Sequence, residues 1–154
     1  MTLAHEPRDP DFEARVRDSF GRQRLMATIG ARLLRISPGR VEIEMPFADG
    51  LTQQHGYVHA GVVTALVDSA CGYGALSLAP PGTEVLTVEY KVNFLAPARG
   101  ERFVASGRVL RAGRRVTVCS GELLAVSGAT ETPVAAMLAT IITVSDSCAA
   151  ANPA

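Results

Sequence analysis

The chain has 154 residues, of which 47% are hydrophobic and 19% charged, a composition that fits one globular domain with a sizeable core and excludes a disordered chain. Its 15 basic and 15 acidic side chains give a formal net charge of zero, so nothing in the charge balance points to nucleic acid or an anionic membrane as a partner. The three cysteines, Cys71, Cys119 and Cys148, are too far apart for a paired metal motif and suit reduced thiols.

The N-terminal third predicts one surface helix followed by a β-hairpin. Its first residues, MTLAHEPRDPDFEAR, lack the apolar core of a signal peptide, which predicts a cytoplasmic protein. Apolar residues then recur at helical spacing among charged ones and predict a helix over residues 10–28, ended by Gly30. These apolar residues are Phe12, Val16, Phe20, Leu25 and Ile29. Two alternating segments follow, ARLLRIS and VEIEMPF, and the SPGR between them predicts a hairpin turn.

A long apolar segment, Val58–Ala79, follows a polar loop and carries a single charge, Asp68. Its length admits a transmembrane helix. However, it is rich in small residues, has a carboxylate near its centre and lacks a flanking basic cluster, which favours a helix buried inside a domain. Its glycines Gly61, Gly72 and Gly74 are expected to let the helix backbone approach a sheet closely. The APPGTE that follows ends the helix, because its prolines and glycine cannot continue it.

The rest of the chain predicts four strands joined by short turns. In Val85–Phe94 apolar and polar residues alternate strictly. Leu86 is therefore expected on an apolar face with every second residue up to Phe94, and Thr87 on the opposite, polar face with Glu89. The turns RAGRR and SGATETP separate the last three strands. These strands are expected at Glu101–Leu110, Val116–Val126 and Val134–Val144. The last residues, SDSCAAANPA, are expected to be loose.

The predicted order is therefore helix, two strands, buried helix and four strands, which places the chain in the α+β class. Short turns between strands mean an antiparallel sheet. Since the long helix must be covered on most of its sides, we expect a strongly curved sheet wrapped around it. We expect an N-terminal helical extension over residues 1–29, one domain over residues 30–145 and a flexible tail over residues 146–154.

Asp68 is the first candidate functional residue. Burying an unpaired carboxylate is expensive, so a buried one is usually paired, protonated or functional. The sequence leaves an alternative open, in which Asp68 lies on a partly exposed helix face or accepts a hydrogen bond from nearby backbone.

The start of the long helix offers a second group of candidates. His59 lies where the helix begins and can hold the preceding loop in place, as loop histidines often do. Ala60 and Gly61 would present unsatisfied backbone N–H groups there, which can polarise a carbonyl or hold an oxyanion. Their small size permits a substrate to approach closely.

The spacing of His59 and Asp68 constrains how they can act together. Nine positions along a helix turn the second side chain to nearly the opposite side and place it on the order of 13 Å away. The two residues cannot easily form a pair within one subunit. If both serve one site, a second copy of the chain must supply one of them, which hints at a site across a two-fold dimer interface.

Several other chemistries lack their motifs in this sequence. The chain has no Gly-x-Ser-x-Gly elbow, no Walker loop and no dinucleotide fingerprint, since GYGALS does not match G-x-G-x-x-G. His55 and His59 are four residues apart, but they lie in a glycine-containing loop without an obvious third ligand. We therefore expect no metal.

Two segments together resemble a known family. GYVHAGVVTALVDSACGYGAL followed by TVEYKVNFLAPARGE resembles the hotdog-fold acyl-CoA thioesterases, specifically the phenylacetate-degradation (PaaI) type, over about residues 30 to 145. The shared features are G-x-x-H-[GA]-G, an acid nine residues after the histidine, T-V-x-x-x-V-x-F and L-x-P-A-x-x-G. The resemblance implies a sheet wrapped around a central helix, a homodimer or homotetramer, an acyl-CoA substrate and no cofactor.

The resemblance also implies roles for particular residues, in two active sites that both chains of a dimer build. Asp68 matches the helix carboxylate that acts as general base or nucleophile, and His59 the loop histidine that shapes the site. Ala60 matches the residue whose backbone N–H polarises the thioester carbonyl, and Gln53 a loop amide. Thr87 falls where a relative has a serine near the acid. Gln is typical of relatives with Glu on the helix, and its combination here with Asp leaves the acyl preference open.

Substrate binding adds Gly61 at the helix start and three arginines of the RAGRR turn. Arg111, Arg114 and Arg115 are candidate contacts for the phosphates of CoA. A solvated hairpin tip is the alternative reading of this turn.

Two rival functions stay open at this stage. Hotdog hydratases and dehydratases also act on acyl thioesters, but they typically pair an Asp and a His five residues apart, a spacing that this chain lacks. An acyl-CoA-binding or regulatory module without turnover is the other rival. A purely structural dimer, which would bind no acyl-CoA, is the bland alternative to all of these.

Overall fold

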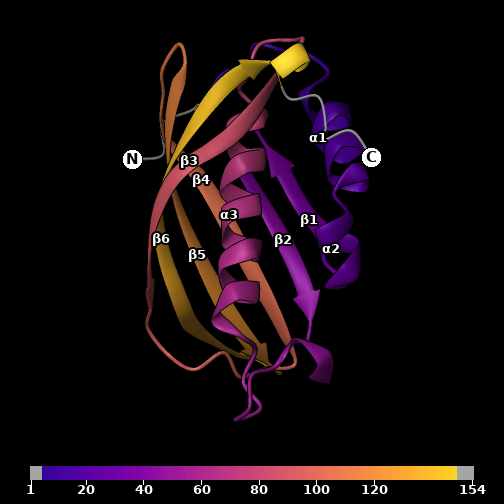
Figure 1. The fold of residues 1–154 in the computed structure, drawn as a ribbon, viewed down its shortest axis with the longest axis vertical. Helices are drawn as coiled ribbons and strands as arrows, with labels where there is room; N and C mark the ends of the chain where they lie inside the picture. The colour runs from indigo at the N-terminus through magenta and orange to yellow at the C-terminus, as the bar shows by residue number, and fades with distance from the viewer. Residues whose placement is uncertain (1–4, 149–154) are drawn as a thin grey trace.

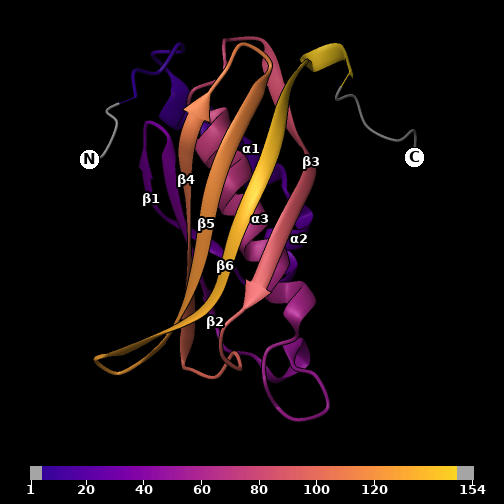
Figure 2. The same ribbon diagram turned by 90° about the vertical axis from the view of Figure 1, so that its left-hand side faces the viewer.

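A curved six-stranded sheet wraps one long helix, α3 (Ala60–Leu76), in the computed structural model, which describes residues 5–148 (Figure 1). The strands are β1 (Arg32–Ser37), β2 (Arg40–Pro46), β3 (Thr83–Phe94), β4 (Arg102–Ala112), β5 (Val116–Ser127) and β6 (Thr130–Ser145). Their order is β1-β2-β4-β5-β6-β3, so β1 and β3 form the two edges, and all neighbours are antiparallel (Figure 2). This arrangement confirms the predicted α+β fold.

The middle of α3 lies against β4 and β5 where each strand has a glycine. A Cβ atom added to Gly107 would lie 2.2 Å from the carbonyl carbon of Ala70, and one added to Gly121 would lie 2.5 Å from Cγ1 of Val67. No real side chain fits at such distances, so the helix reaches the sheet because these two strand positions lack one. The expected role of the helix glycines holds at Gly74, where an added Cβ would lie 3.3 Å from the carbonyl oxygen of Gly107. It is wrong at Gly61, where an added Cβ would meet only the His59 ring, and at Gly72, where it would meet nothing within 4 Å.

The N-terminal segment forms two helices instead of the single one predicted. They are α1 (Phe12–Arg22) and α2 (Arg24–Thr28), and Gln23 between them has an extended backbone with ψ of 96°. The break resets the helical phase. Met26 is therefore fully buried, whereas Leu25, predicted on the apolar face, is 49% exposed.

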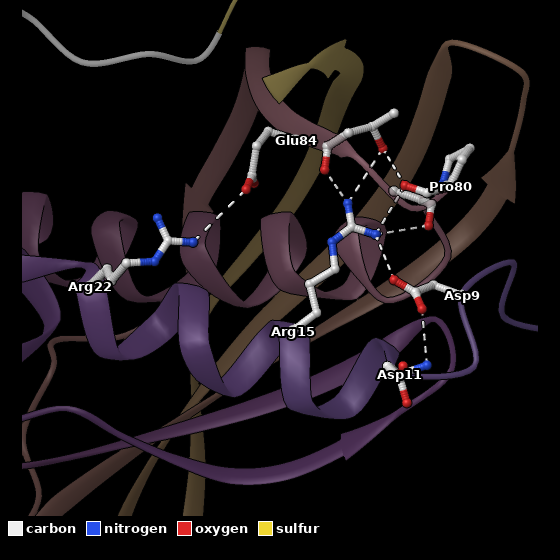
Figure 3. Close-up of polar contacts among 8 residues, drawn as sticks. Asp9, Asp11, Arg15, Arg22, Pro80 and Glu84 are labelled. Atoms are coloured by element: carbon white, nitrogen blue, oxygen red, sulfur yellow. Dashed lines mark hydrogen bonds and ion pairs between the residues drawn. The ribbon is translucent and has the colours of Figure 1, made fainter. Parts of the chain in front are cut away.

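Helix α1 is tied to the connection between α3 and β3 by one arginine. The Arg15 guanidinium donates to the backbone carbonyls of Ala79 at 3.1 Å and Pro80 at 3.0 Å, and also to that of Thr83 (Figure 3). The same group forms an ion pair with Asp9 at 3.2 Å, and both side chains are largely buried. Since α1 also packs on β1, it spans the open side of the wrapped sheet.

Strand β3 contains a β-bulge, so the strictly alternating pattern predicted for it is wrong at one point. Its pairing with β6 shifts between Thr87 and Glu89. Ile141 of β6 is buried and lies opposite Thr87, and buried Met137 lies opposite Val92. Thr87 therefore shares the inner face of the sheet with the apolar residues of the second half of β3, although strand parity placed it with Glu89.

The β5–β6 hairpin is tighter than predicted. Ser127 pairs with Thr130, so the turn consists of Gly128 and Ala129 alone, and Gly128 has a φ of +57°. Such a two-residue turn matches the twist of the strands it joins. The sequence predicted a longer turn because SGATETP contains a glycine and a proline and carries no apolar alternation.

Two short helical turns, Asp49–Leu51 and Asp146–Cys148, complete the described elements. The prediction of a loose tail is wrong at residues 145–148, which form the end of β6 and the second of these helical turns. The rest of that tail, residues 149–154, lies outside the described residues. Over the described range of 5–148, no helix is long and apolar enough to cross a membrane.

Candidate active site

The loop before α3 ends at a histidine that caps the helix. His59 is the N-cap residue, and its ring Nδ1 accepts a hydrogen bond from the backbone N–H of Gly61 at 2.9 Å. Its own backbone N–H donates to the carbonyl of Leu51 at 2.9 Å, which fixes the loop to the helix start. The Gly61 N–H is thus occupied, whereas the Ala60 N–H has no hydrogen-bond partner within residues 5–148. Of the two N–H groups predicted for a ligand, only that of Ala60 is free.

A pocket of about 440 Å³ opens beside this helix start, and we name it the loop pocket. Gln53 and Ala60 line it together with Phe94, the last residue of β3, and Leu95, which follows it. Its other lining residues are Tyr57, Val58, Val63, Ala96, Pro97, Ala98 and Val134. The Gln53 side chain accepts a hydrogen bond from the backbone N–H of His55, which leaves its amide NH₂ for another partner.

Asp68 lies two turns further along α3 and is half-buried. The Thr87 hydroxyl on β3 donates to its Oδ1 at 2.8 Å, and Oδ2 receives no hydrogen bond from any described residue. Burial raises the pKa of Asp68 above its ordinary value, and the hydrogen bond from Thr87 opposes that rise only in part. The β-bulge makes this contact possible, because it turns Thr87 toward the helix.

Asp68 faces a second pocket of about 290 Å³, which we name the helix pocket. Asp68 and Thr87 line it together with Gln23, which lies at the break between α1 and α2. The remaining lining residues are Ser19, Ser69, Gly72, Tyr73, Leu76, Glu84, Val85 and Leu86. Gln23 was not among the residues that the sequence suggested, because the predicted continuous helix over residues 10–28 concealed the break.

Within one chain, the two pockets have no lining residue in common. α3 runs without a break from Ala60 past Asp68, so the helical spacing that separates His59 from Asp68 applies. The structure therefore brings Gln53 and Ala60 together in one place and Asp68 and Thr87 together in another. A single chain does not unite the two groups.

The remaining candidates lie apart from both pockets. Arg111, Arg114 and Arg115 are exposed at the end of the β4–β5 hairpin. In the part of the chain that the structure describes, no three His, Cys, Asp or Glu side chains gather as metal ligands.

Several known proteins are similar to this chain in sequence or structure. A thioesterase family protein from Silicibacter pomeroyi shares the structure with a TM-score of 0.86 and 49% identity, covering 87% of this chain and 98% of that one. The Escherichia coli PaaI protein shares the fold with a TM-score of 0.79 at 16% identity, over 87% of this chain and 94% of that one. A 1,4-dihydroxy-2-naphthoyl-CoA hydrolase of Listeria monocytogenes is 26% identical over 61% of this chain and 76% of its own length.

These relatives place the chain among the thioester hydrolases. The model of the Thioesterase superfamily matches residues 55–132, half of the chain, which include His59, α3 and β3. The chain belongs to this family.

Proposed function

We propose that this protein is an acyl-CoA thioesterase that hydrolyses its substrate to a free acid and CoA. The observation that carries the proposal is Asp68, a half-buried carboxylate with a raised pKa, one hydrogen-bond donor and a free oxygen at the wall of a pocket. Buried carboxylates of this kind cost stability and are common in active sites. The name of the Listeria relative, a CoA thioester hydrolase, supports acyl-CoA as the substrate class.

Hydrolysis of the thioester needs a group that stabilises the carbonyl oxygen and a group that activates water. The free Ala60 N–H, at the positive end of the α3 dipole, stabilises the charge that develops on the thioester carbonyl oxygen. Asp68 takes a proton from water as the water oxygen attacks the carbonyl carbon, and the C–S bond then breaks to release the CoA thiolate, which is protonated. As a nucleophile, Asp68 would instead form an anhydride that water opens. Gln53 orients the water or the thioester.

We further propose that each site is shared between two copies of the chain. β3 is an edge strand, and the two pockets lie at its opposite ends, with Phe94 at the loop pocket and Leu86 at the helix pocket. An antiparallel pairing of two β3 strands about a two-fold axis near Tyr90 sets Phe94 of one copy opposite Leu86 of the other. The loop pocket of one chain then adjoins the Asp68 of its partner.

The surface of β3 supports this pairing. An unpaired edge strand of twelve residues exposes backbone donors and acceptors that another strand can satisfy. Large apolar side chains along it also expose between 45% and 59% of their area. They are Leu86, Val88, Tyr90, Phe94 and Leu95. Within the same proposal, Arg111, Arg114 and Arg115 are candidate contacts for the CoA phosphates.

The test is hydrolysis of a panel of acyl-CoAs, with the released thiol as the readout. Asp68→Asn is expected to lower kcat by about 10²- to 10⁴-fold, the usual contribution of a general base. Asp11→Asn, which changes an exposed carboxylate on the N-terminal side of α1, is the matched control and should leave kcat unchanged. If the wild-type protein binds acyl-CoAs but hydrolyses none, it is a binding module. If Asp68→Asn keeps the full rate, hydrolysis stands and the role of Asp68 falls.

A further inference from the structure

The break between α1 and α2 directs a polar side chain into the helix pocket. The Gln23 amide nitrogen donates to the Ser69 hydroxyl at 3.3 Å, and its amide oxygen accepts from the Tyr73 hydroxyl at 3.3 Å. Both partners belong to α3, one of them next to Asp68. These two bonds use one of the two N–H groups of the amide and one of the two lone pairs of its oxygen. Gln23 thus keeps one donor and one acceptor for a ligand in the pocket.

The wall that holds Gln23 is fixed in place at both ends of α1. Arg15 anchors the first half of the helix to three backbone carbonyls of the α3–β3 connection (Figure 3). At the other end, Arg22 lies 4.0 Å from the carboxylate of Glu84, which lines the helix pocket (Figure 3). The rings of Phe20 and Tyr73 also pack with centroids 5.7 Å apart. α1 is therefore a fixed wall of the pocket, able to discriminate between ligands.

We propose that Gln23 determines acyl specificity, by selecting short acyl groups that carry a hydroxyl or carbonyl oxygen at the end remote from the thioester. The inference rests on the proposed function, because the acyl group of a thioester at Asp68 has the helix pocket beside it. The pocket volume of about 290 Å³ lies at the small end of ligand pockets, which suits a short acyl group. The polar side chains of Ser19, Gln23 and Glu84 also line the pocket, so a purely apolar chain end would leave the remaining Gln23 donor and acceptor without a partner on the substrate.

The experiment measures kcat/KM for straight-chain acyl-CoAs of increasing length and for their ω-hydroxy counterparts. At the best length, wild type is expected to prefer the hydroxylated substrate by about 3- to 10-fold, the value of one neutral hydrogen bond. Gln23→Leu should abolish or reverse that preference, mainly through KM, while hydrolysis of the unsubstituted substrate persists. Thr28→Val makes a similar polar-to-apolar change at an exposed position of α2 and should leave the preference intact.

A second variant protects the test against loss of folding. Tyr73→Phe removes the hydroxyl that orients the Gln23 amide and should weaken the preference in the same direction. If the ratio of kcat/KM for the hydroxylated and unsubstituted substrates is unchanged in Gln23→Leu, the inference is overturned and the thioesterase proposal stands. If Gln23→Leu does not fold, an unchanged ratio in Tyr73→Phe has the same meaning. If wild type hydrolyses the panel with no preference for the hydroxylated members, the inference is likewise refuted. Failure of wild type to hydrolyse these substrates while it hydrolyses other acyl-CoAs refutes the inference alone, and failure on every acyl-CoA refutes both proposals.

Discussion

A shared site makes a strong prediction about mixed dimers. One subunit carries Asp68→Asn, which disables the helix pocket, and the other carries Gln53→Ala with His59→Ala, which disables the loop pocket. In the mixed dimer, one site combines both lesions and the other combines the intact pocket of each chain. That intact site should give about half the wild-type rate per dimer, although each homodimer is inactive.

The expected half of the wild-type rate follows from the separation of the two pockets, which share no lining residue within a chain. If each site were built within one chain, every site of the mixed dimer would contain one lesion, and the rate would stay at the level of the mutant homodimers. Co-expression with two different tags and sequential affinity purification isolates the mixed dimer. Release of thiol from an acyl-CoA is the assay.

The reciprocal pairing gives the opposite result and serves as the control. Here one subunit is wild type, and its partner carries Asp68→Asn, Gln53→Ala and His59→Ala together. A shared site puts one lesion in each site and predicts almost no activity, whereas a site within one chain predicts about half the wild-type rate. Half activity in this dimer, with none in the first, would refute the proposed shared site.

Three further predictions concern charge and stability. Thr87→Val removes the hydrogen bond that opposes the effect of burial on Asp68, so the pKa of Asp68 should rise further. The acid limb of the kcat/KM–pH profile should then move to higher pH. A limb that does not move would contradict the role of Asp68 as the base. Asp68→Asn should raise the melting temperature at neutral pH but not in strong acid, as scanning calorimetry can measure. Arg15→Met should lower the free energy of unfolding, measured by urea denaturation, by about 2–3 kcal/mol. Arg17→Met, which breaks an exposed ion pair, should change it by less than about 0.5 kcal/mol. Equal effects would contradict the anchoring role of Arg15.

The sequence was sufficient for features that depend on local periodicity. The long apolar run with one charge predicted α3, and helical spacing alone separated His59 from Asp68 before any tertiary contact was known. The alternating segments likewise predicted all six strands in their order along the chain. Such patterns repeat over many residues, so a single irregular residue does not hide them.

The features that the sequence did not reveal depend on one residue and on a distant partner. The bulge in β3 exists because of its register with β6, and nothing in TVEYKVNF marks it. It decides whether Thr87 faces Asp68 or solvent, so strand parity alone gave the wrong face. The break at Gln23 is similar, because the side chain that it directs inward finds its partners, Ser69 and Tyr73, more than forty residues away.

The cost of Asp68 links these features to function. Since its pKa is raised in the folded protein, the folded state holds the proton more tightly than the unfolded state, and stability falls as pH rises from the ordinary aspartate pKa to the raised one. At neutral pH the carboxylate therefore destabilises the fold. A second hydrogen-bond donor at Oδ2 would reduce that cost, but it would also lower the basicity that a general base needs. The bulge supplies one donor, Thr87, to Oδ1, and no residue in the described range donates to Oδ2. Within the proposed function, this partial satisfaction suits a carboxylate that takes up and releases a proton.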